Sequence, residues 1–210
     1  MTVHVRLLRE PELRDPVLIE GLPGVGLVAN LAAAQLIQRW EAEKFAELYS
    51  STFQSLTVTT RGGFSPPLNE LYAHRGSGRD AIILFGNTQA STPRGQYELS
   101  GRVLDLAQGL GCRLVVTLGG MKVARVQGAE PRIFCAATDG TTLSGLDGLG
   151  FERITGRITG AAGLLLGLAG IRGMRGFCLL AETEGKKADP VAASAVLDAL
   201  VRTPTGLSMG

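Results

Sequence analysis

The chain has 210 residues, of which 45% are hydrophobic and 19% are charged, and its formal net charge is +2. This length and apolar content suffice for one large hydrophobic core, so we expect a single domain over residues 1–210. The small net charge, without a cluster of Lys and Arg beside aromatic residues, argues against nucleic acid as a partner. Residues 1–15 are too charged for a secretory signal, and the longest apolar run, residues 160–171, is too short to cross a bilayer, so we expect a cytoplasmic protein without a membrane partner.

The cysteines are odd in number and widely spaced. Cys112, Cys135 and Cys178 lie in or beside apolar runs, which favours reduced, buried thiols over a disulfide framework. The sequence contains no Cys-x-x-Cys pair, so it gives no reason to expect zinc, and we expect no cofactor.

In chain order, the first predicted strand covers residues 3–8, where apolar and polar residues alternate. Residues 17–19 form a short apolar run that predicts a buried strand, and a glycine-rich turn with Gly21, Pro23, Gly24 and Gly26 follows it. The next segment, residues 27–40, consists mainly of good helix formers and predicts a helix. Further strands are predicted over residues 44–49, 55–60, 68–74 and 81–85, with a loop over residues 61–67.

The second half repeats this alternation of strand and helix. Thr92 and Asp189 each precede a proline, which predicts capped helices that begin at Pro93 and Pro190, and Gly111 is expected to end the first of them. The second is expected to line one side with Val191, Ala195, Val196 and Ala199. Strands are predicted over residues 113–118, 132–137 and 176–181, a short helix after Asp139, and a glycine-spaced helix over residues 160–169. In that helix Gly163 and Gly167 lie on one side, which we expect to approach a neighbour closely.

Continuous apolar strands between helices indicate an α/β protein with a mostly parallel or mixed central sheet covered on both faces. Ligands in such sheets bind at the carboxyl ends of the strands. Polar or glycine-rich segments follow four of the apolar strands, and they define the candidate crevice residues: Pro23, Gly24, Gly26, Asn87, Gln89, Gly119, Gly120, Lys122, Glu182 and Thr183.

The glycine turn allows more than one interpretation. Gly24, Gly26 and Ala29 fit the G-x-G-x-x-[GA] pattern of dinucleotide-binding sites. The acidic residue of such sites should end the next strand, where this chain has Leu48, Tyr49 and Ser50, and Glu47, near the right distance, falls within the strand. A phosphate-binding P-loop does not fit, because no Gly-Lys-Ser/Thr follows. We therefore favour glycines that allow close packing.

Catalytic groups are few. The chain lacks a G-x-S-x-G motif, and its two histidines, His4 and His74, fall in early strands away from the expected crevice. Glu182 and Glu184 could act as acid and base if both faced the crevice. Lys122 and Arg125 could meet an anion or simply form a solvated surface.

Four blocks of sequence, in this order, carry a resemblance to a known family: LIEGLPGVGLVAN, TPRGQYELSGRVLDLAQGLGCRLVVTLGG, GRITGAAGLLLGLAGIRG and LLAETEGKKADPVAASAVLDAL. They resemble the archaeal, PAC2-like branch of the proteasome assembly chaperone family. The resemblance implies a three-layer αβα sandwich related to nucleoside phosphorylases, without established catalysis. It also implies self-association and binding to proteasome α-type subunits or related proteins.

Three functional hypotheses follow. The first is a non-enzymatic, chaperone-like domain that binds proteins and acts as a homo-oligomer. The second is a nucleoside- or phosphate-binding enzyme that uses Gly24, Gly26, Gly119, Gly120 and Glu182, and the third is a homo-oligomer that only scaffolds. Archaeal relatives that dock on the proteasome resemble one another in a hydrophobic-Tyr-any tail, whereas this chain ends in Ser208-Met209-Gly210, so docking through such a tail is not expected.

Overall fold

The computed structural model describes residues 3–60, 62–124 and 129–208. Its strands are β1 (Val3–Leu7), β2 (Val17–Gly21), β3 (Glu43–Ser50), β4 (Val58–Thr60), β5 (Gly63–Ser65), β6 (Asn69–His74), β7 (Ala81–Gly86), β8 (Leu114–Lys122), β9 (Ile133–Ala137), β10 (Glu152–Arg153) and β11 (Arg175–Thr183). Its helices are the 3-10 turn η1 (Val25–Leu27), α1 (Val28–Arg39), α2 (Pro93–Gly109), α3 (Gly140–Ser144), α4 (Gly160–Ile171) and α5 (Pro190–Arg202).

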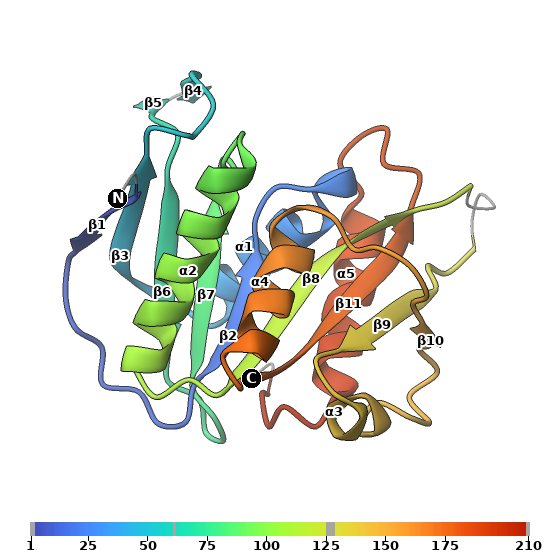
Figure 1. The fold of residues 1–210 in the computed structure, drawn as a ribbon. Coiled ribbons are helices and arrows are strands. Elements are labelled where there is room, and N and C mark those ends of the chain that lie inside the picture. The colour runs from blue at the N-terminus through green and yellow to red at the C-terminus, as the bar shows by residue number, and fades with distance from the viewer. Residues whose placement is uncertain (1–2, 61, 125–128, 209–210) are drawn as a thin grey trace.

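Over the described ranges, nine strands form one sheet in the order β1-β3-β6-β7-β2-β8-β11-β9-β10, and β4 and β5 form a separate hairpin (Figure 1). The four central strands β7, β2, β8 and β11 are parallel, whereas β1, β3 and β6 pair antiparallel and β9 is antiparallel to β11. The sheet is therefore mixed, which is the second of the two arrangements that the sequence allowed. The reason is chain length: the few residues between β6 and β7 can join only antiparallel strands.

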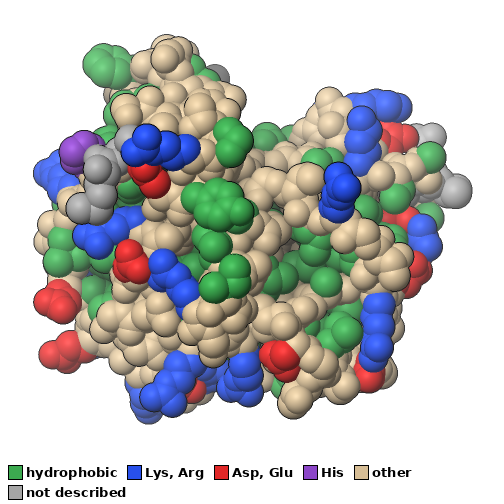
Figure 2. Space-filling model, in the orientation of Figure 1, with side chains coloured by type: hydrophobic (Ala, Val, Ile, Leu, Met, Phe, Trp, Pro, Cys, Tyr) green, Lys and Arg blue, Asp and Glu red, His purple; other side chains and the backbone are tan. Residues whose placement is uncertain are grey.

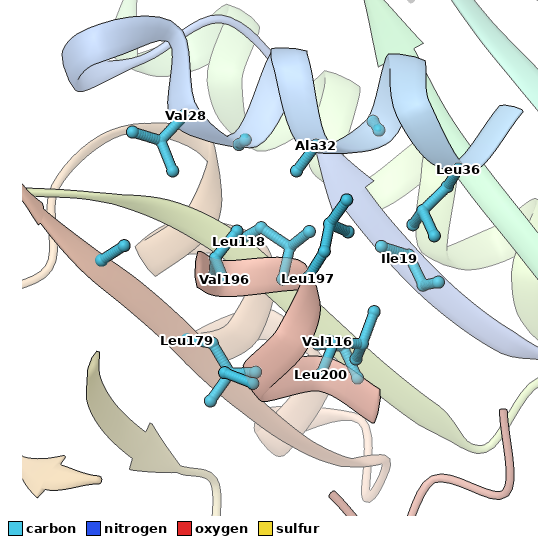
Figure 3. Close-up of a cluster of buried hydrophobic side chains, with 14 of the residues drawn as sticks. Ile19, Val28, Ala32, Leu36, Val116, Leu118, Leu179, Val196, Leu197 and Leu200 are labelled. Atoms are coloured by element: carbon cyan, nitrogen blue, oxygen red, sulfur yellow. The ribbon is translucent and has the colours of Figure 1, made fainter. Parts of the chain in front are cut away.

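Helices cover both faces of the sheet, which gives three layers. On one face, α1 and α5 bury Ile19, Val116 and Leu179 beneath their apolar sides (Figure 3). On the other face, α2 and α4 lie in front of the sheet in Figure 1 and bury Leu18 and Val115. Strands with helices on both sides must be apolar on both sides, which is why their sequences read as unbroken hydrophobic runs.

Both predicted helix starts are confirmed. The side chain of Thr92 accepts a hydrogen bond from the N–H of Gly95 at 3.1 Å, and that of Asp189 accepts one from the N–H of Ala192 at 3.0 Å. Gly111 takes a φ of +83° directly after the last turn of α2. The three cysteines are free and buried, as predicted.

Several local expectations are corrected. Residues 61–67, predicted as a loop, contain β5, which pairs with β4. The strand predicted to end before Gly119 continues as β8 to Lys122, because β11 pairs with it along its whole length. A methyl group on Gly163 would overlap the carbonyl of Ile158 in the preceding segment, but nothing lies within 4 Å of one on Gly167.

The buried side of α5 matches the expected one in part, since Val196 and Ala199 are buried as predicted. It is formed by Ala192, Ala193, Val196, Leu197, Ala199 and Leu200. Val191, expected on that side, is 53% exposed. None of the helices within the described residues combines the length and apolarity needed to cross a membrane.

Candidate functional site

The connections that leave the neighbouring strands β2 and β7 turn to opposite faces of the sheet. β2 leads to α1 on one face and β7 leads to α2 on the other. Such a switch point leaves room for a ligand at the carboxyl ends of the strands. The crevice expected from the sequence is therefore to be sought at the carboxyl ends of β2 and β7.

Gln89 holds three segments together at this point. Its side-chain Nε2 donates a hydrogen bond to the carbonyl of Pro23, in the turn after β2. Its Oε1 accepts hydrogen bonds from the N–H of Ala161 in α4 at 3.2 Å and from Nε2 of Gln96 at 3.0 Å. Both ends of the Gln89 amide are thus engaged, so its role is to position these segments.

A cavity of about 250 Å³ opens beside Gln89. Five of the predicted crevice residues line it: Gly24, Gln89, Gly119, Gly120 and Lys122. The first turn of α4 and the preceding Arg157 and Ile158 complete the opposite wall. The structure thus brings half of the predicted crevice residues to one cavity.

Glu20 lies at the buried end of this cavity, and sequence reasoning missed it. Its side chain belongs to β2 and the residue is only 1% exposed. Oε1 accepts a hydrogen bond from the N–H of Leu22 at 2.9 Å, whereas Oε2 has no partner among the described residues. Burial raises the pKa of Glu20 to about 8, because the single N–H of Leu22 only partly offsets the lost hydration of the charged form. The carboxyl group is therefore protonated at neutral pH and can donate a hydrogen bond.

A row of polar side chains extends from Glu20 across the sheet. Thr117 of β8 is the register partner of Glu20, and Cys178 of β11 is the register partner of Thr117. All three alternate with residues that pack under α1 and α5, so they point to the face covered by α2 and α4. Burial also raises the pKa of the Cys178 thiol to about 12, so this thiol stays protonated.

The remaining glycine of the motif, Gly26, allows close packing between the turn after β2 and the end of β11, away from the cavity. It has a φ of +63°, and a Cβ there would lie 2.7 Å from Oγ1 of Thr183. Oγ1 of Thr183 donates to Asp189 at 2.8 Å, and the N–H of Asp189 donates to the carbonyl of Gly26 at 2.9 Å. Gly26 and Thr183 thus join the start of α1 to the start of α5 and do not line the cavity.

The dinucleotide pattern lacks its structural context. The strand that follows α1 is β3, which lies between β1 and β6 and not beside β2. Its Glu47 accepts hydrogen bonds from Lys44 and from the hydroxyl of Tyr49, both at 2.8 Å. The bond from Lys44 lowers the pKa of Glu47, which is therefore a partner of Lys44 far from the glycine turn.

Glu182 and Asn87 are bound elsewhere. Glu182 is buried and accepts a hydrogen bond from Nε of Arg132 at 2.8 Å, and Arg132 also pairs with Glu152 at 3.0 Å. The side chain of Asn87 accepts from the N–H of Leu68 and donates to the carbonyl of Pro66, so it fixes the segment before β6.

The other titratable candidates lie away from the cavity. Glu184 pairs with Lys186 on the surface at 3.3 Å. His74 stacks on Trp40 with ring centroids 4.7 Å apart, and His4 is exposed on β1. Three residues considered in the sequence analysis lie outside the described residues: Arg125, Met209 and Gly210. No group of His, Cys, Asp and Glu in the part of the chain that is described could hold a metal ion.

Comparisons with known proteins place the whole fold. An uncharacterized protein of Methanocaldococcus jannaschii is 38% identical over 189 residues, which cover 89% of this chain and 72% of the relative. The crystal structure of Pyrococcus furiosus PbaB, described as an archaeal proteasome activator, matches with a TM-score of 0.88 and 39% identity over 99% of this chain and 91% of that chain. Pyrococcus furiosus PbaA, described as an archaeal homolog of proteasome-assembly chaperone, matches with a TM-score of 0.82 and 25% identity over 100% and 84%.

These matches agree with the resemblance carried by the four sequence blocks. A model of the PAC2 family matches residues 18–209, which include every block. The chain therefore belongs to the PAC2 family.

Proposed function

We propose that this chain is a non-enzymatic, protein-binding domain with a chaperone-like role, that it acts as a homo-oligomer and that proteasome components, α-type subunits among them, are its partners. The observation that carries the proposal is the match to PbaB, because 39% identity extends over nearly all of both chains. PbaB is described as a proteasome activator, and PbaA as a homolog of a proteasome-assembly chaperone.

The placement of the candidate catalytic groups supports the non-enzymatic part. Glu182 is held by Arg132 and Glu184 pairs with Lys186, so these two carboxylates do not meet across the cavity as acid and base. His74 is stacked on Trp40. A general base must reach the proton that it removes, and these groups point elsewhere.

The alternative is a nucleoside- or phosphate-binding enzyme with a nucleoside phosphorylase-like fold. The cavity lined by Gly24, Gly119, Gly120 and Lys122 favours it. The test is phosphate-dependent release of a free base from purine nucleosides by the purified protein. We expect none, and release that saturates with substrate would replace the proposal above.

The hairpin β4–β5 offers a surface for a protein partner. It lies beyond the end of the main sheet in Figure 1, and its Phe64 is 79% exposed. Figure 2 shows hydrophobic side chains at this projecting end of the molecule. Burying an aromatic ring in an interface contributes about 1.5–3 kcal/mol, so Phe64 is suited to anchor a partner.

The partner is tested with the purified chain and purified proteasome from the same organism, by co-elution in size-exclusion chromatography and by peptide hydrolysis. We expect co-elution, and Phe64→Ser should weaken it about tenfold or more. Ile171→Ser is the matched control, because Ile171 is 84% exposed at the far end of α4. A wild-type chain that does not co-elute would reject proteasome partners, and equal binding by both variants would reject the hairpin as the contact.

Self-association is tested separately. Light scattering coupled to size-exclusion chromatography should give a mass of two or more chains of 22.0 kDa each. A monomer across the working range of concentration would reject the homo-oligomer.

A further inference from the structure

The cavity beside Gln89 has a polar floor that the protein itself leaves unsatisfied. Glu20 lines this cavity, and its Oε2 is buried and has no hydrogen-bond partner among the described residues. Oγ1 of Thr117, the register partner of Glu20 in β8, is likewise buried without a partner there, but Thr117 does not line the cavity. Buried polar atoms in native proteins almost always have partners, from the protein or from a bound molecule. A volume of about 250 Å³ exceeds the share of one water, roughly 30 Å³, several times over. The space next to Glu20 is therefore large enough for an organic molecule.

The walls of the cavity are mostly apolar. Leu22, Val25 and Ala29 lie on one side, and Ile158 and Leu180 lie on the other. Such walls favour a ligand with an apolar body and disfavour a small inorganic ion by itself.

The mouth of the cavity is positively charged. Lys122 and Arg157 line it, both are exposed, and neither forms an ion pair within the described residues. Figure 2 shows Lys and Arg side chains along this upper edge of the molecule. The first turn of α4 adds the positive end of its dipole through Thr159, Ala161 and Ala162, which also line the cavity. An anion is therefore favoured at the mouth and a cation is repelled.

We propose that this cavity binds a small organic anion with an apolar body, whose neutral hydroxyl or amide end hydrogen-bonds to Glu20 and whose charged end lies beside Lys122 and Arg157. Glu20 supplies a hydrogen bond at the floor, the walls supply apolar contact, and the mouth supplies the opposite charge. The inference does not depend on the protein partner, because the cavity lies at the carboxyl ends of β2 and β8 and not on the β4–β5 hairpin.

The test uses three probes of similar shape. 4-Hydroxyphenylacetate carries both the hydroxyl and the charge, phenylacetate lacks the hydroxyl, and tyramine reverses the charge. Binding is followed by NMR of alanine methyl groups, because Ala29, Ala161 and Ala162 line the cavity, whereas Ala107 and Ala199 are buried elsewhere and serve as references. We expect 4-hydroxyphenylacetate to shift the three cavity methyls, phenylacetate to bind about tenfold more weakly, and tyramine not to bind.

Variants separate the floor from the mouth. Glu20→Gln keeps a hydrogen-bonding side chain and should retain binding within about threefold, whereas Glu20→Met should lose about tenfold. Lys122→Glu combined with Arg157→Glu should abolish binding, and because both positions are exposed these substitutions leave the core intact. Unchanged reference methyls show that each variant is folded. No shift of the cavity methyls up to about 10 mM probe, or equal shifts with tyramine, would overturn the proposal.

Discussion

Glu20 and Thr117 are register partners in the β2–β8 pairing, and each keeps a buried side-chain oxygen without a hydrogen-bond partner among the described residues. Two buried polar groups without hydrogen-bond partners, side by side in the sheet, destabilise the fold. Departures from a consistent apolar core concentrate at functional sites, and Glu20 lines the cavity, so Glu20 marks this end of the sheet more clearly than any glycine does.

The first prediction concerns the stability of the protein against pH. Folding raises the pKa of Glu20 from 4.5 to about 8, so the folded state holds a proton that the unfolded state releases between these values. The stabilising contribution of this proton is complete below pH 4.5 and is lost as pH rises towards 8, by roughly 4–5 kcal/mol in total. We therefore expect Glu20→Gln to be more stable than the wild type at pH 8 and to have little advantage at pH 4.5.

Urea unfolding of both proteins at several pH values measures this difference. The contributions of other titrating groups to the pH dependence of stability cancel in the comparison, because the two proteins differ only at Glu20. The charged residues that line the cavity with Glu20 are Lys122 and Arg157. A difference between the two proteins that stays constant from pH 4.5 to 8 would show that Glu20 titrates normally.

The second prediction distinguishes glycines that allow close packing from glycines that cradle a ligand. A methyl group on Gly120 would overlap the carbonyl oxygen of Val25 and come within 2.7 Å of the Thr183 methyl. We expect Gly120→Ala to lower the free energy of unfolding by about 1–3 kcal/mol, because backbone must shift to accommodate it.

Gly24→Ala is the matched control. Nothing lies within 4 Å of a Cβ at Gly24, and its φ of −154° is extended backbone that any residue adopts. This substitution should leave stability unchanged or raise it by about 0.4–1 kcal/mol through the unfolded state. If thermal unfolding instead shows that both variants lose the same stability, the packing difference between the two glycines is not real.

The order of strands and helices could be predicted from local patterns. Thr92 and Asp189 predict where α2 and α5 begin, because capping depends on neighbouring residues alone. The sheet order could not be predicted this way, because it depends on which strands meet across the whole chain. Thus β3, which follows α1 directly, pairs with β1 and β6, whereas β2 pairs with β7 and β8.

The site could be predicted only in outline. The glycine-rich strand ends point to the edge of the sheet where the cavity lies, and Gly24, Gln89, Gly119, Gly120 and Lys122 line it. Glu20 was missed because a glutamate at the end of a strand usually faces solvent, whereas here its strand lies between β7 and β8 and the residue is buried. The one hint is that it interrupts an apolar run directly before the glycine turn.

The last prediction tests the hydrogen bonds by which Asp189 joins the start of α5 to the end of β11 and to the turn before α1. Asp189 caps α5 through the N–H of Ala192 at 3.0 Å and accepts the hydroxyl of Thr183 at 2.8 Å, while its own N–H binds the carbonyl of Gly26. Asp189→Ala removes these two side-chain bonds and should lower the free energy of unfolding by at least about 1–2 kcal/mol. Asp139→Ala is the control, since Asp139 caps the short, exposed α3 through the N–H of Thr142, and its bonds from the hydroxyls of Thr138 and Thr142 are equally local. Denaturant unfolding should show a clearly smaller loss for Asp139→Ala, and an equal loss would mean that the contact with Thr183 adds nothing to the cap.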